Sequence, residues 1–574
     1  MEKIKKRNES KRGEEMSTIK IIPLGGVREN GKNMYAVEVD EDIFVLDCGL
    51  MFPETELLGI DVVIPDFSYL EENKNRVTAV FLTHGHEDAI GALPYFLQKF
   101  DVPVFGTELT IALAKLFVEK DSQVSSFDDY HIVDENTEIE FGDVVASFFR
   151  TTHTIPDSVG VALKTDEGSI VYTGDFKFDQ SAKPMYQSNL SRIADIGKGK
   201  VLALLSDSSE AESPVENISD LKIAEEVLDT FQNAEGRIIV ASVASNILRI
   251  QQVFDAAHKS HKKIFITGSN LEEIVQIAMQ LNKLQLPNED LIVPITDIEK
   301  YSDQEIVVLE TGLTGEPIKT LTRMAKGRHT QVNIKEGDLV YIVTSPSTAM
   351  EVTVAQAENL IYRAGGTVKQ ISDNLKASGH ATPNDLKLMI NLIKPTYFIP
   401  VQGEYRMLSA HAKLAHEVGM PYKNIFIPGK GDIMEYKNER MHVAGQVTVG
   451  NTMVDGIGIG DIGNIVLRDR KLLSEDGIFV AVVTINRRKS KIISGPEVMT
   501  RGFVYVKENT DLINQSNEII REVVEENLNR KEFEWSRLKQ EIRDALNKHL
   551  FEQTRRRPVI LPIIMETSSR NRKN

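Results

Sequence analysis

One stretch of the sequence restricts the possible folds more than any other, VTAVFLTHGHEDAIGALPYFL at residues 77–97. It begins as an apolar, β-rich run, passes through a polar loop that contains His84, His86 and Asp88, and continues into an apolar helical pattern. Two imidazoles separated by one residue and followed by a carboxylate can converge on one divalent cation. The stretch therefore predicts a buried strand that carries a metal-binding loop at its carboxyl end.

Polar residues follow other predicted strands in the same way. Asp47 lies in LDCGL, His153 in RTTHTIPDS and Asp175 in YTGDFKFD. Only 12 histidines occur in the 574 residues, so their placement at strand ends favours a metal site over histidines of an ordinary surface turn. A general acid and base pair formed by Glu87 and Asp88 is the weaker alternative.

The composition limits the metal ligands and the partners. The single cysteine, Cys48, cannot form an intrachain disulfide or a cysteine-rich zinc module, so histidines and carboxylates must hold any metal ion. A net charge of -17 opposes bulk electrostatic coating of nucleic acid, and an RNA ligand would need a local basic groove. The sequence contains no apolar run of ~18 residues and no secretory signal. We expect a cytoplasmic protein without a membrane span.

The change of pattern along the chain predicts several domains. In the middle, helical stretches alternate with the short strands GRIIVAS, KKIFITG and DLVYIVTS, which is typical of an α/β domain. Towards the C-terminus we expect the strands GIFVAVVTI and GFVYV and two amphipathic helices between Thr510 and Gln553. The predicted organisation is a disordered basic tail (1–16), a first domain in two parts (17–214 and 376–447), an inserted domain (215–375), a linker (448–465) and a C-terminal α/β domain (466–574).

Several motifs, in order along the chain, closely resemble the bacterial ribonuclease J family. They are THGHEDAIG, HTIPDS, TGDFKFD, LLSDSSEAE, ASNILRIQQ, SGHATPNDLKLM and PVQGEYRML, and the resemblance extends over residues 18–565. It implies an α/β fold, with a metallo-β-lactamase αββα sandwich, an inserted β-CASP domain and a C-terminal α/β domain through which the chain oligomerises. It also implies RNA maturation, rRNA processing and mRNA decay by metal-dependent hydrolysis of phosphodiesters, as a 5′-to-3′ exonuclease and in some members an endonuclease.

The resemblance assigns metal-binding roles to the polar strand ends. The ligands of the first metal ion are then His84, His86, His153 and Asp175. Asp175 also bridges to a second ion. Asp88 is then a ligand of the second ion, and Asp47 orients the ligating histidines.

Further motif residues are assigned to RNA. Asp207 belongs to the acidic β-CASP motif, and His380 lies near the scissile phosphate. Ser245 and Asn246 contribute to the pocket for the 5′ end. The segment that lines the RNA phosphate pocket is Lys376, Ala377, Ser378, Gly379 and His380.

The sequence departs from the active members of the family at two metal-binding positions. Those members have HxHxDH and PVHGE, whereas this chain has Ala89 and Gln402 in place of the two histidines. Alanine cannot coordinate a cation, and a neutral amide is a poor ligand for zinc or manganese beside imidazoles. Tyr172, Lys376 and Leu248 also replace histidines that are common in active members. We therefore predict one tightly bound Zn²⁺ or Mn²⁺ ion per chain, with the second site weak or absent.

Two functions fit this pattern. The chain is either a weakly active ribonuclease J subunit or a catalytically inactive partner of an active paralogue, with a structural or RNA-positioning role. In both cases we expect it to form a homodimer or a hetero-oligomer. A lactonase or thioesterase on the same fold is disfavoured by the β-CASP motifs. For His411 and His416 we favour ordinary helix residues over a metal pair, and for the basic segments TRRRP and RNRKN solvated ends over phosphate contacts.

Overall fold

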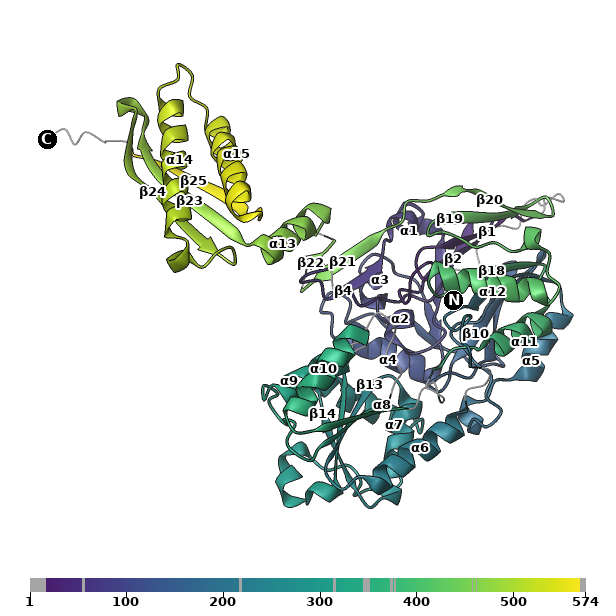
Figure 1. Cartoon of the computed structure of the whole chain (residues 1–574). Coiled ribbons are helices and arrows are strands. Elements are labelled where there is room, and N and C mark those ends of the chain that lie inside the picture. The colour runs from purple at the N-terminus through teal and green to yellow at the C-terminus, as the bar shows by residue number, and fades with distance from the viewer. Residues whose placement is uncertain are drawn as a thin grey trace. The chain divides into compact units, whose positions relative to one another are not determined.

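The computed structural model describes residues 17–53, 57–215, 219–312, 316–343, 351–371, 375, 378–456, 458–460 and 462–567 (Figure 1). The predicted tail over residues 1–16, together with Lys376 and Ala377, lies outside these residues. The chain divides into two compact units. The first comprises residues 1–52 and 62–452, and the second comprises residues 53–61 and 453–574.

Two facing sheets form the centre of the first unit. In spatial order, the eight-stranded sheet contains β20 (Arg440–Gln446), β19 (Asp432–Lys437), β1 (Ile19–Pro23), β2 (Tyr35–Val39), β3 (Asp42–Leu46), β5 (Val77–Phe81), β6 (Val104–Gly106) and β7 (Tyr130–Ile132). The six-stranded sheet contains β18 (Tyr397–Val401), β12 (Val201–Asp207), β11 (Gly168–Tyr172), β10 (Val159–Thr165), β9 (Val144–Arg150) and β8 (Glu138–Phe141). Ile21 and Phe81 of the first sheet share a buried cluster with Phe148 and Ile399 of the second. Burial of this shared apolar surface holds the sheets together.

Helices cover the outer faces of both sheets. On the six-stranded sheet, Phe149 and Leu204 pack with Ile193, Leu386 and Ala415 from three helices. These helices are α5 (Leu190–Lys198), α11 (Pro383–Ile393) and α12 (Tyr405–Glu417). α4 (Glu108–Glu119) contacts β6 and β7 of the other sheet, and the shorter helices of this region are α1 (Ser68–Glu72), α2 (Glu87–Ile90) and α3 (Leu93–Leu97). The order of layers is therefore helix, sheet, sheet and helix.

A parallel five-stranded sheet forms the middle of the chain. Its strands, in spatial order, are β14 (Lys263–Thr267), β15 (Ile306–Gly312), β13 (Ile238–Val243), β16 (Leu339–Ile342) and β17 (Thr367–Gln370). The helices of this part are α6 (Asp220–Asn233), α7 (Ile247–Lys259), α8 (Ser269–Gln280), α9 (Glu316–Ala325) and α10 (Glu351–Arg363). The α/β pattern predicted the sheet but missed β15, which lies between β14 and β13.

The second unit contains a three-stranded sheet with helices on one face. β23 (Ile478–Asn486) lies between β24 (Lys491–Arg501) and β25 (Val559–Glu566), and α14 (Thr510–Leu528) and α15 (Trp535–Thr554) lie side by side across the sheet (Figure 1). α13 (Asn464–Asp476) contacts β25, and β21 (Asn451–Asp455) pairs with β22 (Gly458–Ile459) in the predicted linker.

The prediction of a strand for GFVYV is wrong. β24 ends at Arg501, Gly502 adopts a φ of 70°, and a short 3₁₀ helix follows at Val506–Glu508. The aromatic and β-branched residues of GFVYV favour a strand locally, but Phe503 is buried in the core under the helices instead. None of the helices in the described part of the chain combines the length and the apolar character needed to cross a bilayer.

Candidate metal centre

The parallel strands bring the polar motif residues to one edge of each sheet. β3 and β5 are parallel neighbours with Leu46 opposite Phe81, so Asp47 and the His84 loop leave the sheet together. β11, β12 and β18 are parallel neighbours in the facing sheet, where Tyr172 pairs with Leu205 and Asp207 with Val401. Carboxyl ends of neighbouring parallel strands open at the same edge of a sheet, which is where such folds place their sites. This topology brings together residues that are far apart in the sequence.

Three histidines and an aspartate form a compact ligand cluster. The ring centroids of His84, His86 and His153 are 4.9 to 5.1 Å apart, and their candidate ligand atoms all lie within 4.8 Å of one another. Oδ2 of Asp175 lies 3.7 Å from Nε2 of His84 and 4.0 Å from Nε2 of His153. Ligand atoms about 2.0 Å from a tetrahedral zinc ion would be roughly 3.3 Å apart, so the cluster is slightly wider than a closed site.

Unpartnered buried atoms support a cation in this cluster. Nε2 of His84 and Oδ1 of Asp175 are buried and have no hydrogen-bond partner among the described residues. Burial of such polar atoms without a partner is costly, and a coordinated cation would satisfy both. The residues present therefore fit one metal ion.

Hydrogen bonds fix the orientation of the histidine rings. Nδ1 of His153 donates to the backbone oxygen of Gly379 at 2.9 Å, which leaves its Nε2 free for a metal ion. Nδ1 of His84 lies 2.9 Å from Oγ1 of Thr83, whose hydroxyl donates to Asp47 at 2.9 Å. The predicted role of Asp47 is compatible with this geometry, but Asp47 reaches His84 through Thr83 and does not contact it directly.

Burial and charge set the protonation of the cluster. Burial lowers the pKa of His86 to about 3 and that of His153 well below its usual value, so both rings are neutral and can offer lone pairs. Burial also acts to lower the pKa of His84, but the carboxylates of Asp88 and Asp175 outweigh it and raise the pKa to about 9. Burial raises the pKa of Asp175 to about 8. Protons therefore occupy the cluster when no cation is bound.

His380 and Asp207 form an ion pair beside the ligand cluster. Nδ1 of His380 lies 2.7 Å from Oδ2 of Asp207 and 3.9 Å from Oδ2 of Asp175. Burial acts to lower the pKa of His380, but these two carboxylates raise it to about 10. His380 thus carries a positive charge that can stabilise a developing oxyanion.

The predicted second metal position has a different arrangement. Nε2 of Gln402 donates to Oδ2 of Asp88 at 3.2 Å, and Nδ2 of Asn33 donates to the same oxygen at 3.4 Å. Ala89 is buried, and its methyl group offers no ligand. Oδ1 of Asp88 lies 3.7 Å from Nε2 of His84, so Asp88 is within reach of the first cluster. Amide hydrogens therefore take up Oδ2 of Asp88, while one oxygen of Asp88 still lies within 4.8 Å of ligand atoms of His84 and Asp175.

Residues around the predicted RNA pocket have structural partners. Oγ of Ser245 donates to Glu87 at 3.1 Å, and the side chain of Asn246 accepts from the backbone of Arg249 at the start of α7. Oγ of Ser378 accepts from the backbone N–H of His380. Glu87 is thus bonded to Ser245, which does not favour the alternative pair of Glu87 with Asp88.

A side chain at Gly379 would come within 2.7 Å of the His153 ring, so only glycine fits that position. His411 is buried beside Ser208, and His416 stacks on Tyr422, so these two histidines do not form a metal pair.

Sequence reasoning missed the residues that act on the ligands. Thr83 links Asp47 to His84, Oγ1 of Thr154 lies 3.1 Å from Nε2 of His86, and Asn33 donates to Asp88. Thr83 and Thr154 each adjoin a ligand in the sequence, so that adjacency was a usable signal. Asn33 gave no such signal, because its contact with Asp88 depends on the fold.

Four family models match successive parts of the chain. They are the metallo-beta-lactamase superfamily over residues 27–209, the ribonuclease J beta-CASP domain over 235–360, the Zn-dependent metallo-hydrolase RNA specificity domain over 368–428 and the ribonuclease J C-terminal domain over 465–567. These matches confirm the predicted fold class. Together with the histidine and aspartate cluster, they support a metal site.

Similar proteins cover nearly the whole chain. Ribonuclease J 2 of Streptococcus pyogenes serotype M3 is 54% identical over 551 residues, which are 96% of this chain and 100% of that protein. Ribonuclease J 2 of Staphylococcus aureus strain NCTC 8325 is 48% identical over 566 residues, 99% of this chain and 100% of that protein. A crystal structure of a protein of unknown function from Enterococcus faecalis V583 matches with a TM-score of 0.51 and 15% identity, over 73% of this chain and 100% of that one. This last likeness concerns the fold alone.

Proposed function

The chain belongs to the ribonuclease J family of metal-dependent ribonucleases, and from this premise we propose that it hydrolyses RNA with one tightly bound cation and a reduced rate. The observation that supports a reduced rate is the hydrogen bond that Gln402 donates to Asp88. In two-metal hydrolysis the paired ions stabilise both the attacking and the leaving oxygen, so the loss of one ion removes part of that stabilisation.

The residues at the metal centre would have three separate roles, which are metal binding, orientation of the ligands and stabilisation of negative charge. His84, His86, His153 and Asp175 would hold a Zn²⁺ or Mn²⁺ ion, which when bound activates water and neutralises phosphate charge. Gly379 holds the His153 ring, and Asp47 holds His84 through Thr83. His380, charged and held by Asp207, would donate a hydrogen bond to a phosphate oxygen as negative charge develops.

Finer properties also belong to this proposal. We take the substrate to be RNA degraded from its 5′ end, with endonuclease cleavage as a further activity, in rRNA processing and mRNA decay in the cytoplasm. The proposed domain boundaries and the proposed 5′-end pocket at Ser245 and Asn246 are those predicted from the sequence. Oligomerisation through the second unit, with a copy of this chain or an active paralogue, is supported by the exposed apolar side chains of Ile563 and Met565 on β25.

Metal analysis of the purified protein tests the proposal. We expect about one ion per chain in the natural sequence, and more in Ala89→His/Gln402→His together with a faster cleavage of RNA. Ala89→Ser/Gln402→Asn is the matched control, because it changes the same positions without adding a strong ligand. Two tightly bound ions in the natural protein would contradict the proposal.

A catalytically inactive partner of an active paralogue is the second candidate. It is favoured by the same observation, since Asp88 has amide partners in place of the two lost histidines. Cleavage of 5′-monophosphorylated RNA with Mn²⁺ by His84→Ala separates the two functions. A fall of at least ~10-fold is expected for an enzyme, because even outer-sphere partners of a ligand contribute 10- to 100-fold. An unchanged rate would favour the inactive partner.

A further inference from the structure

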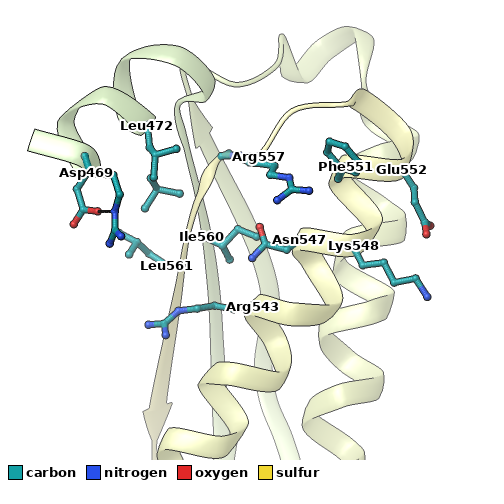
Figure 2. Close-up of a pocket in the computed structure, with 13 residues that line it drawn as sticks. Asp469, Leu472, Arg543, Asn547, Lys548, Phe551, Glu552, Arg557, Ile560 and Leu561 are labelled. Atoms are coloured by element: carbon teal, nitrogen blue, oxygen red, sulfur yellow. Dashed lines mark ion pairs between the residues drawn. The ribbon is translucent and has the colours of Figure 1, made fainter. Parts of the chain in front are cut away.

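A basic cavity lies within the second unit and shares no residue with the metal centre. It has a volume of about 950 Å³ and lies between α13, α15 and β25. Figure 2 shows Asp469 and Leu472 of α13 on one side and Arg543 and Asn547 of α15 on the other, with β25 between them. The volume is at the upper end for small-molecule sites, so the cavity can admit more than a single phosphate ion.

Cations outnumber carboxylates in the lining. The basic residues are Arg468, Arg543, Lys548 and Arg557, and the acidic residues are Asp469 and Glu552. Arg468 makes a long ion pair with Asp469, at 4.0 Å, and Arg543 donates to a glutamine oxygen at 3.4 Å. Within the described part of the chain, Lys548 has no hydrogen-bond or ion-pair partner. In a chain with a net charge of -17, this local excess of positive charge favours an anionic ligand.

The same cavity also offers flat and apolar surface. The guanidinium group of Arg557 lies 4.5 Å from the centre of the Phe551 ring, and that of Arg555 lies 5.5 Å from it. Leu472 and Leu561 contribute apolar lining, and the side chain of Leu561 is 41% exposed. An aromatic ring and an apolar strand beside cations match the base and the phosphate of a nucleotide. Inorganic phosphate would use only the cations.

We propose that this cavity binds single-stranded RNA, with phosphates on Arg468, Arg543 and Lys548 and a base against Phe551. The inference rests on the proposed function, which makes RNA the substrate. It adds a second RNA contact, which would hold a part of the strand away from the bond being cleaved. Binding energy of this kind lowers the concentration of RNA needed for half-maximal rate without changing the chemistry at the metal centre.

Fluorescence anisotropy on the full-length, metal-loaded protein tests the proposal. The probe is a fluorescent single-stranded oligouridylate with phosphorothioate linkages, which slow its cleavage. We expect Arg468→Gln/Arg543→Gln/Lys548→Gln to bind the probe at least ~10-fold more weakly, and the slope of log affinity against log salt to decrease by about 2. Arg521→Gln/Lys531→Gln/Lys539→Gln is the matched control, because it removes the same charge from exposed positions outside the cavity.

The possible outcomes distinguish a failure of this proposal from a failure of the proposed function on which it rests. No binding by the natural protein would contradict RNA as the ligand and thus both proposals. Binding that is equal in the natural protein and the cavity variant, or equally weak in the cavity and control variants, would contradict the cavity alone. If the cavity variant unfolds, Phe551→Leu provides the test without a change of charge. We expect this variant to bind roughly 10-fold more weakly, and unchanged binding would contradict the proposal.

Discussion

The predicted first and second metal positions lie side by side and differ in what their side chains present. At the first, His84 and Asp175 present buried atoms that have no hydrogen-bond partner among the described residues and that a cation would satisfy. At the second, Gln402 and Asn33 present N–H groups to Asp88, and that oxygen is already satisfied. The strands that carry both positions are intact. The comparison indicates that the same fold accommodates hydrogen bonds at the predicted second position.

The largest expected effect concerns the two aspartates. Asp175→Asn should weaken metal binding more than ~100-fold, because it removes a ligand and outer-sphere partners alone contribute 10- to 100-fold. Asp88→Asn is the matched change at the second position and should not weaken binding of the first ion, because Asp88 is not one of its proposed ligands and its carboxylate favours the proton on His84 that the ion displaces. Isothermal titration of the metal-free proteins with Zn²⁺ measures both. Equal losses in the two variants would show that the positions act as one binuclear site.

The next effect is a dependence of metal affinity on pH. In the metal-free protein the pKa of His84 is raised to about 9, so below that pH a cation must displace a proton from the ring. Affinity should therefore fall as the pH is lowered from 9 to 7, by about 10-fold per pH unit for each proton displaced. A zinc-binding dye, calibrated at each pH, can follow this change. An affinity that is constant over this range would mean that His84 is neutral before the ion binds.

A smaller effect is expected at Tyr172, for which the sequence resemblance predicts a histidine in active members. Its hydroxyl donates to Asp47 at 2.8 Å, and burial raises the pKa of Asp47 to about 6. Tyr172→Phe removes that donor and should lower the affinity for the first ion about 10-fold. It should also cost about 1–3 kcal/mol of stability, because Asp47 stays buried with fewer partners. Chemical denaturation measures the stability and metal titration measures the affinity. If both are unchanged, Asp47 does not act on the first site.

Much of the fold is predictable from the sequence because the secondary structure that short segments favour agrees with the structure that they adopt in the folded chain. The run at residues 77–97 forms a buried strand and a histidine loop as expected, but the predicted helix is divided into two short helices, α2 and α3. GFVYV fails because its composition favours a strand while the hydrogen-bonded ladder ends at Arg501. β25 was not predicted, since PVILPII carries two prolines and pairs only with β23, which is distant in the sequence.

The candidate site is predictable only as far as its residue types allow. The three histidines and the aspartate of the first cluster stand out because few side chains bind metals. The contacts of Asn33 and Thr83 depend on how loops from different strands meet, and no local pattern reports that. The roles of Ser245, Asn246 and Ser378 towards RNA remain predictions.

Anomalous X-ray diffraction from crystals grown with a saturating concentration of Mn²⁺ or Zn²⁺ tests the central claim most directly. We predict one strong anomalous peak among His84, His86, His153 and Asp175, with the amide of Gln402 still bonded to Asp88. A second peak of similar height, coordinated by Asp88 and the oxygen of Gln402, would contradict the account.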